Sequence, residues 1–235
     1  MINAADLLFA IGSLLLVIGF IQAIPRAFRH GEWHRLDTLF VVALLVMPLL
    51  IRGSGPTTVA VRFALFHLLP YALFRLVRHF RDVPGWLAVP LLVPPAVALT
   101  AKVLLPRVPY LLIRSAVELL AATAVASVAM VFVSEAARAV GVKRRRLGFA
   151  AAGTLLFAID FISSAAGYWI ATAGVVFWRT LTPTVEGLAL ICYYFAFSTP
   201  RRLLSQWRQA EQAKYLAGIA QREPEERAQM APGDL

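Results

Sequence analysis

Long apolar runs follow one another along most of the chain, and short segments rich in arginine, glycine or proline separate them. A helix that crosses a bilayer needs about 20 apolar residues, within a range of roughly 17 to 25. Seven runs come near that length, at approximately residues 6–24, 37–52, 57–77, 85–104, 109–137, 147–173 and 177–198. The pattern therefore predicts an all-α, polytopic membrane protein with seven transmembrane helices.

Prolines interrupt two of these runs. Pro90, Pro94 and Pro95 fall in the fourth run, and Pro183 falls in the seventh. Proline removes a backbone N–H and its ring crowds the preceding turn. A membrane helix tolerates this when neighbouring groups satisfy the freed carbonyls. We expect these two helices to be kinked or locally opened.

Lysine and arginine gather in alternate connections between the runs, and cytoplasmic loops of membrane proteins are enriched in these residues. One side of the membrane receives Arg26, Arg29 and Arg35, then Arg75, Arg78 and Arg81, and then Arg138, Lys143, Arg144, Arg145 and Arg146. The other side keeps Arg52, Lys102, Arg107 and at most Arg179. The alternation predicts that the N-terminus lies outside and the C-terminus in the cytoplasm.

Composition agrees with a membrane location. Hydrophobic residues make up 60% of the chain and charged residues 15%, whereas a soluble domain is about half apolar and a quarter charged. The formal net charge of +10 is divided among clusters between the apolar runs. The charge therefore reflects topology, and no nucleic-acid partner is expected. We expect a multi-pass protein of the bacterial inner (cytoplasmic) membrane, with the lipid bilayer as a partner.

The chain after Thr199 differs from the part before it. The segment PRRLLSQWRQAEQAKYLAGIAQ predicts an amphipathic cytoplasmic helix, with Thr199 as its N-cap and Pro200 in its first turn. Residues 222–235 are polar and are expected to stay disordered unless a partner orders them. The expected organisation is a transmembrane bundle over 1–199, followed by a cytoplasmic amphipathic helix and polar tail over 200–235.

Six ionisable side chains fall inside the predicted spans, where each costs roughly 2.5 to 3.5 kcal/mol on insertion scales and is a candidate for function. They are Arg62, Arg114 and Glu186 in the outer half of the bilayer and His67, Glu118 and Asp160 near its middle. Arg114 and Glu118 are spaced i, i+4 and are expected to pair. Two interpretations stay open, because such groups either bind a polar ligand or a proton or only join helices as structural contacts.

Motifs of several enzyme and cofactor classes are missing. The sequence has no phosphate-binding loop, no GxSxG motif and no nucleophile beside a base, so we expect a protein that is not an enzyme. No lysine falls in the seventh run, so no retinal Schiff base is expected. The HGEWH segment at 30–34 lacks the HExxH order of zinc peptidases, and no metal site is expected there. The sequence identifies no cofactor.

The membrane exit from Tyr193 to Trp207, YYFAFSTPRRLLSQW, resembles the junction that ends the multi-helix membrane input region of certain bacterial sensor histidine kinases. In that family an aromatic helix end runs into a proline, then arginines, then a tryptophan. Thr199 and Leu203 depart from the family's pattern, which has a second proline and a further tryptophan there. The resemblance implies a membrane sensor whose last helix transmits a shift to a cytoplasmic helix. No phosphoacceptor histidine or ATP-binding domain follows Trp207, so we expect that the chain is not itself a kinase.

Two functions follow as hypotheses. The first is a non-catalytic module, similar to a sensor input domain, that acts through helix contacts with another membrane or cytoplasmic protein. The second is an accessory or structural subunit of a larger membrane complex, for example an electron-transfer or light-harvesting one. The candidate contact residues are Arg201, Arg202, Leu204 and Trp207. Trp207 is expected to anchor the helix at the bilayer surface or against a partner, because its ring offers both apolar area and a polar N–H.

Overall fold

The computed structural model describes residues 4–30, 33–51, 56–79, 82, 90–93, 96–97, 100, 110–170 and 175–229. Every regular element in these ranges is helical. The helices are α1 (Ala4–His30), α2 (Trp33–Leu50), α3 (Pro56–His67), α4 (Leu69–Val77), η2 (Pro90–Leu92, a 3-10 turn), α6 (Tyr110–Arg138), α7 (Gly141–Ile170), α8 (Val175–Phe197) and α9 (Arg201–Gln229). The all-α prediction is confirmed for this part of the chain.

The third apolar run differs from its prediction, because it forms two helices rather than one. α3 and α4 meet at Leu68, two residues before Pro70, which has no N–H to continue the helical ladder. Hydrogen bonding resumes at once on either side of the break: the Leu68 N–H donates to the Ala64 carbonyl at 3.0 Å, and the Ala72 N–H donates to the Leu68 carbonyl at 3.1 Å. α8 continues through Pro183 as one helix. Most of the fourth run, including Pro94 and Pro95, lies outside the described residues.

Four helical segments are long and apolar enough to cross a membrane, within the ranges that the structure describes. They are Ala4–Gln22, Ser115–Arg138, Gly141–Gly167 and Thr180–Phe197. The apolar segments Leu36–Pro48 and Ala64–Val77 are shorter. Large apolar side chains such as Leu14, Met130 and Ile162 point outward from the long segments. Exposed side chains of this kind on helices of membrane-spanning length are suited to contact with lipid.

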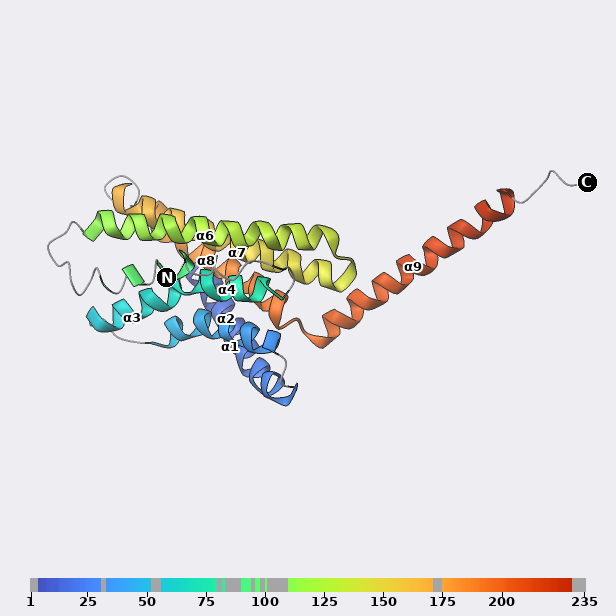
Figure 1. The fold of residues 1–235 in the computed structure, drawn as a ribbon, viewed down its shortest axis with the longest axis horizontal. Coiled ribbons are helices and arrows are strands. Elements are labelled where there is room, and N and C mark those ends of the chain that lie inside the picture. The colour runs from blue at the N-terminus through green and yellow to red at the C-terminus, as the bar shows by residue number, and fades with distance from the viewer. Residues whose placement is uncertain are drawn as a thin grey trace, which may run out of the picture.

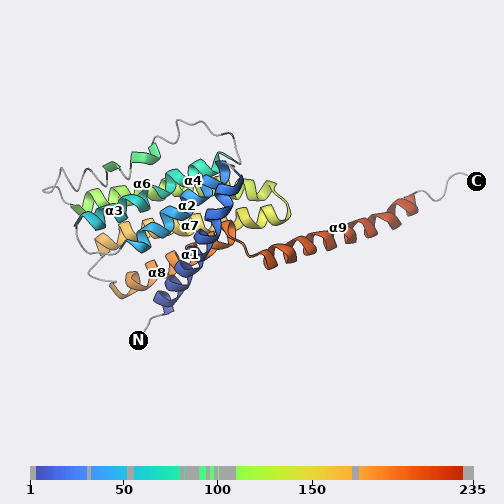
Figure 2. The same cartoon turned by 90° about the horizontal axis from the view of Figure 1, so that it is seen from below.

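The helices form one bundle, and α9 leaves it (Figures 1 and 2). α6 and α7 lie antiparallel and side by side, α8 packs on α7, and α1 crosses α8 obliquely. α2 and α4 complete the bundle against α1 and α6. The fully buried side chains at its centre include Leu16, Val41, Val46, Leu73, Phe132, Phe157, Phe161 and Tyr193.

Two glycines allow α1 and α8 to touch backbone to backbone. A Cβ atom added at Gly187 would lie 2.8 Å from the Phe9 nitrogen and 2.9 Å from the Leu8 carbonyl carbon. One added at Gly12 would lie 2.7 Å from the Gly187 carbonyl oxygen. Small residues permit this close approach of membrane helices, whose association depends on van der Waals packing. The α1–α8 crossing therefore requires glycine at these positions.

Candidate functional site

A buried histidine and a buried glutamate meet inside the bundle. His67 ends α3 beside the break at Leu68, and its Nε2 lies 3.3 Å from Oε2 of Glu118 on α6. The two side chains are 1% and 5% exposed. The His67 ring also packs against Phe161 of α7, with 5.3 Å between ring centroids. The pair therefore joins α3 to α6 within the apolar interior.

Two further carboxyl groups belong to the same cluster. Asp160 on α7 is 3% exposed, and the charges of Glu118 and Glu186 both act on it. Arg62 on α3 exerts an opposite charge on Glu186 of α8. Three carboxyl groups from α6, α7 and α8 thus share one electrostatic environment, and α3 supplies the histidine and the arginine. We call these five residues the polar cluster.

Asp160 is the carboxyl group of the polar cluster that has a buried oxygen without a hydrogen bond to any described residue. Its Oδ1 is buried with no hydrogen-bond partner among the described residues. Ionised groups inside a membrane are costly unless they are paired. Glu118 has His67 as a partner, whereas no described residue forms an ion pair with Asp160. Asp160 is therefore the group best placed to hold a proton or to accept a hydrogen bond from a polar ligand.

The structure brings together five of the six ionisable residues that the sequence singled out. They come from four helices, so their proximity is a property of the tertiary fold. The sixth, Arg114, lies on α6, and its side chain is outside the part that the structure describes. The expected Arg114–Glu118 contact stays a prediction, and the partner that the structure gives Glu118 is His67. The His30, Glu32 and His34 side chains also lie outside that part.

An ion-pair group between α2 and α4 was not predicted. Asp37, largely buried near the start of α2, accepts from Arg75 Nη2 at 2.8 Å and lies 2.8 Å from His79 Nε2. From the sequence, Arg75 was expected only to contribute positive charge that sets the topology. The sequence feature that could have predicted this ion-pair group is Asp37, an acidic residue at the start of an apolar run. It lies on the same predicted side of the membrane as the arginine clusters. This group ties the ends of α2 and α4 together.

The start of α9 is clamped to α7. Trp207 stacks on Phe149, with 6.2 Å between ring centroids, and the Arg145 guanidinium lies 5.3 Å from the centre of the Trp207 ring. Arg146 Nε donates to the carbonyl of Ala196 at 2.7 Å, which satisfies a free carbonyl at the end of α8. The partner of Trp207 within the chain is thus the bundle itself.

Three other expectations for this segment have different outcomes. The Thr199 hydroxyl donates back to the Phe195 carbonyl instead of capping α9, so its predicted role as N-cap is wrong. The Pro200 carbonyl accepts from the Leu204 N–H at 3.0 Å, and because α9 begins at Arg201, Pro200 lies at the N-cap position, one residue before its predicted place in the first turn. Helix α9 extends to Gln229, so residues 222–229, expected to be disordered, are helical. Leu204 is half-buried and Arg202 exposed, while the Arg201 side chain is outside the described part.

The polar cluster and the contacts that hold the start of α9 have two helices in common, α7 and α8. Asp160 and Arg145 belong to α7, and Glu186 and Ala196 belong to α8. Between them the Tyr193 hydroxyl donates to Thr154 Oγ1 at 2.9 Å, since the Thr154 proton is directed to the Ala150 carbonyl.

No protein-family model, curated protein or solved structure matches the chain.

Proposed function

We propose that the chain is a non-catalytic membrane module that acts by presenting α9 to a protein partner, in the manner of a sensor input domain. The observation that carries the proposal is the geometry of α9: its first turns are fixed to α7, and the rest of its 29 residues project away from the bundle (Figure 1). On the projecting part, Tyr215 is 72% exposed and Leu216 is 64% exposed. A charged helix that displays such residues is suited to docking on another protein.

The contacts between α7 and α8 support a link between the bundle and α9. The N-terminal part of α7 contacts both helices: Arg146 of α7 donates to the end of α8, and Phe149 of α7 stacks on Trp207 at the start of α9. A shift of α8 against α7 would therefore move α9. Asp160 and Glu186 lie across the same pair of helices, so a proton or ligand gained by the polar cluster would bias that shift.

We further propose seven spans, with the N-terminus outside and the C-terminus in the cytoplasm. The basic ends of α4 and α6 and the basic start of α7 lie at the end of the bundle from which α9 departs (Figure 1), as the positive-inside rule requires. In a variant with Cys192 replaced by alanine, a membrane-impermeant maleimide should label Ser54→Cys in intact cells. It should label Val140→Cys only after the membrane is opened. Labelling of both from one side would contradict the seven-span topology.

Site-specific photo-crosslinking tests the docking role of α9. A benzophenone amino acid at Leu216 should form an adduct with a cytoplasmic protein in living cells. The same group at Met130 on α6, which is also 64% exposed but on a predicted lipid-facing surface, should form none. Protein adducts at Met130 alone would instead favour the accessory-subunit hypothesis, in which the bundle surface makes the contact. The identity of the captured protein also distinguishes the two hypotheses. A signalling protein fits the sensor-module hypothesis, and a subunit of a membrane complex fits the accessory-subunit hypothesis.

A further inference from the structure

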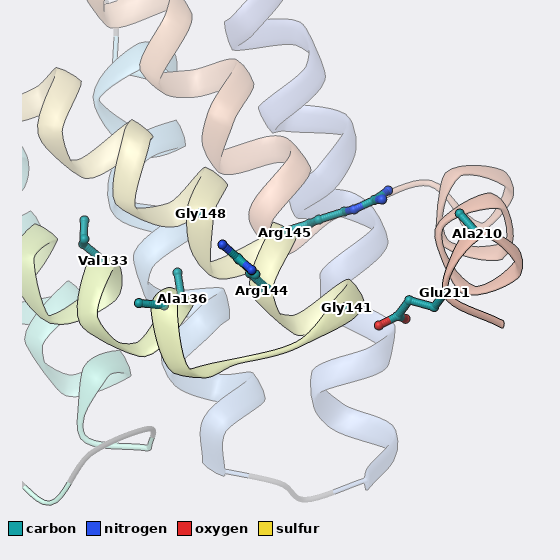
Figure 3. A pocket seen from close by; sticks show the side chains of 9 residues that line it. Val133, Ala136, Gly141, Arg144, Arg145, Gly148, Ala210 and Glu211 are labelled. Carbon is teal, nitrogen blue, oxygen red and sulfur yellow. The ribbon is translucent and has the colours of Figure 1, made fainter. Parts of the chain in front are cut away.

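A cavity of about 730 Å³ opens between the α6–α7 turn and α9 (Figure 3). Its floor on α6 is apolar and consists of Val133, Ala136 and Ala137. Its α7 wall carries Arg144 and Arg145, and α9 closes it with Glu211. We call this space the turn cavity. It lies at the turn that joins the candidate spans Ser115–Arg138 and Gly141–Gly167, where a bilayer crossed by both spans would end.

The α7 wall carries positive charge that the chain only partly compensates. Four consecutive cations, Lys143 to Arg146, occupy the first turns of a 30-residue helix that has no acidic residue there. The N-terminal end of a helix already carries partial positive charge, so cations at this place are unfavourable and an anion is stabilised. The Arg144 guanidinium forms no ion pair with any residue that the structure describes. The wall therefore favours an anionic occupant.

A carboxylate of the chain itself already reaches toward this wall. Glu211 points from α9 at Gly141, the first residue of α7 (Figure 3), and a Cβ atom at position 141 would overlap the Glu211 carboxylate. Gly141 also has a φ of +63°, which glycine adopts without strain. Arg145 is turned toward α9, where Trp207 holds it. Glu211 thus adds a negative charge to the cavity lining beside Gly141, while Arg144 forms no ion pair with it and keeps its charge available to the cavity.

We propose that the turn cavity binds the headgroup of an anionic phospholipid from the adjacent leaflet, and that the negative charge of Glu211 in the cavity lining opposes this binding. Arg144 faces the phosphate, and the apolar α6 floor accepts the start of an acyl chain. A soluble phosphate would use the arginine but would leave the apolar floor empty, so the combination of the two surfaces favours a lipid. The proposal does not depend on the protein partner proposed for α9. Basic cavities between transmembrane helices at the cytoplasmic surface recognise lipids of this kind.

Lipid titration of the purified full chain in a neutral detergent, followed by native mass spectrometry, tests the proposal. Phosphatidylglycerol should bind, and zwitterionic phosphatidylcholine should bind more weakly. Arg144→Ala should weaken phosphatidylglycerol binding about fivefold, the value of one surface charge. Arg202→Ala removes the same charge from α9 outside the cavity and should change it little. Glu211→Gln should strengthen binding, because a negative charge that repels the headgroup is removed from the cavity lining.

A second pair of variants distinguishes binding inside the turn cavity from attraction of the lipid by positive charge on the protein surface. Among the residues that the structure describes, and apart from the helix's own nearby backbone, no atom lies within 4 Å of a Cβ added at Gly148 or at Gly167, so both positions accept a Cβ without a clash. Gly148→Leu places its side chain in the turn cavity and should abolish phosphatidylglycerol binding with the charge unchanged, whereas Gly167→Leu should retain it. Equal losses in Arg144→Ala and Arg202→Ala, or unchanged binding in Gly148→Leu, would overturn the proposal. Displacement of the lipid by millimolar inorganic phosphate would assign the site to a soluble anion instead.

Discussion

Replacing Gly187 by valine should lower the free energy of unfolding by about 3 kcal/mol or more and separate α1 from α8. The added Cβ would come within 2.8 Å of the Phe9 nitrogen and 2.9 Å of the Leu8 carbonyl carbon. These are backbone atoms of a helix and cannot move aside as the end of a flexible side chain does. The variant therefore has to push the two helices apart, which removes one of the most extensive contacts of the bundle.

Unfolding in a detergent titration, read by circular dichroism, measures this loss. Gly167→Val is the matched control, since it makes the same chemical change at a helical position where the new Cβ has no neighbour within 4 Å among the described residues outside its own helix backbone. The control should differ from the native protein by less than about 0.5 kcal/mol, the usual range for surface substitutions. Gly12→Val should resemble Gly187→Val, because it enters the same crossing. Equal stability of the Gly187 and Gly167 variants would show that the helices do not touch there.

His67→Leu should cost about 3 to 5 kcal/mol of stability, since it leaves the Glu118 carboxylate buried without its imidazole partner. Leucine retains apolar contact with Phe161, so the loss should come mainly from the broken pair. The double variant His67→Leu, Glu118→Leu removes both polar groups and should recover much of the loss. Replacement of a buried pair by apolar residues of similar volume is often neutral.

A double-mutant cycle on detergent unfolding curves gives the coupling between the two residues. Leu119→Ala, next to Glu118 but half-exposed on the outer side of α6, is a control that should leave the coupling unchanged. Strictly additive losses for His67 and Glu118 would mean that the two side chains do not interact. Such a result would also remove His67 from the polar cluster and weaken the case for Asp160 as a proton or ligand site.

The sequence alone predicted the helical class and the approximate place of most helices, because a membrane helix must be apolar over a length fixed by the bilayer. The predicted run 109–137 matches α6, and 177–198 matches α8. The start of α7 was predicted six residues late, at 147 rather than at Gly141. Hydropathy marks where a segment leaves the lipid, and Lys143 to Arg146 continue the helix beyond that level. The polar start of α7 is also what makes one wall of the turn cavity.

Only the tertiary structure decided which of these residues meet. Helices that contact both lipid and other helices are apolar on every side, so their sequence carries little of the periodicity that shows which face is buried. Six ionisable candidates could be identified from the sequence, but the pairing of His67 on α3 with Glu118 on α6 could not. Neither the contact of Gly12 with Gly187 nor the stacking of Trp207 on Phe149 could be predicted from the sequence. These contacts depend on the rotation and crossing of whole helices, which packing fixes only when the bundle assembles.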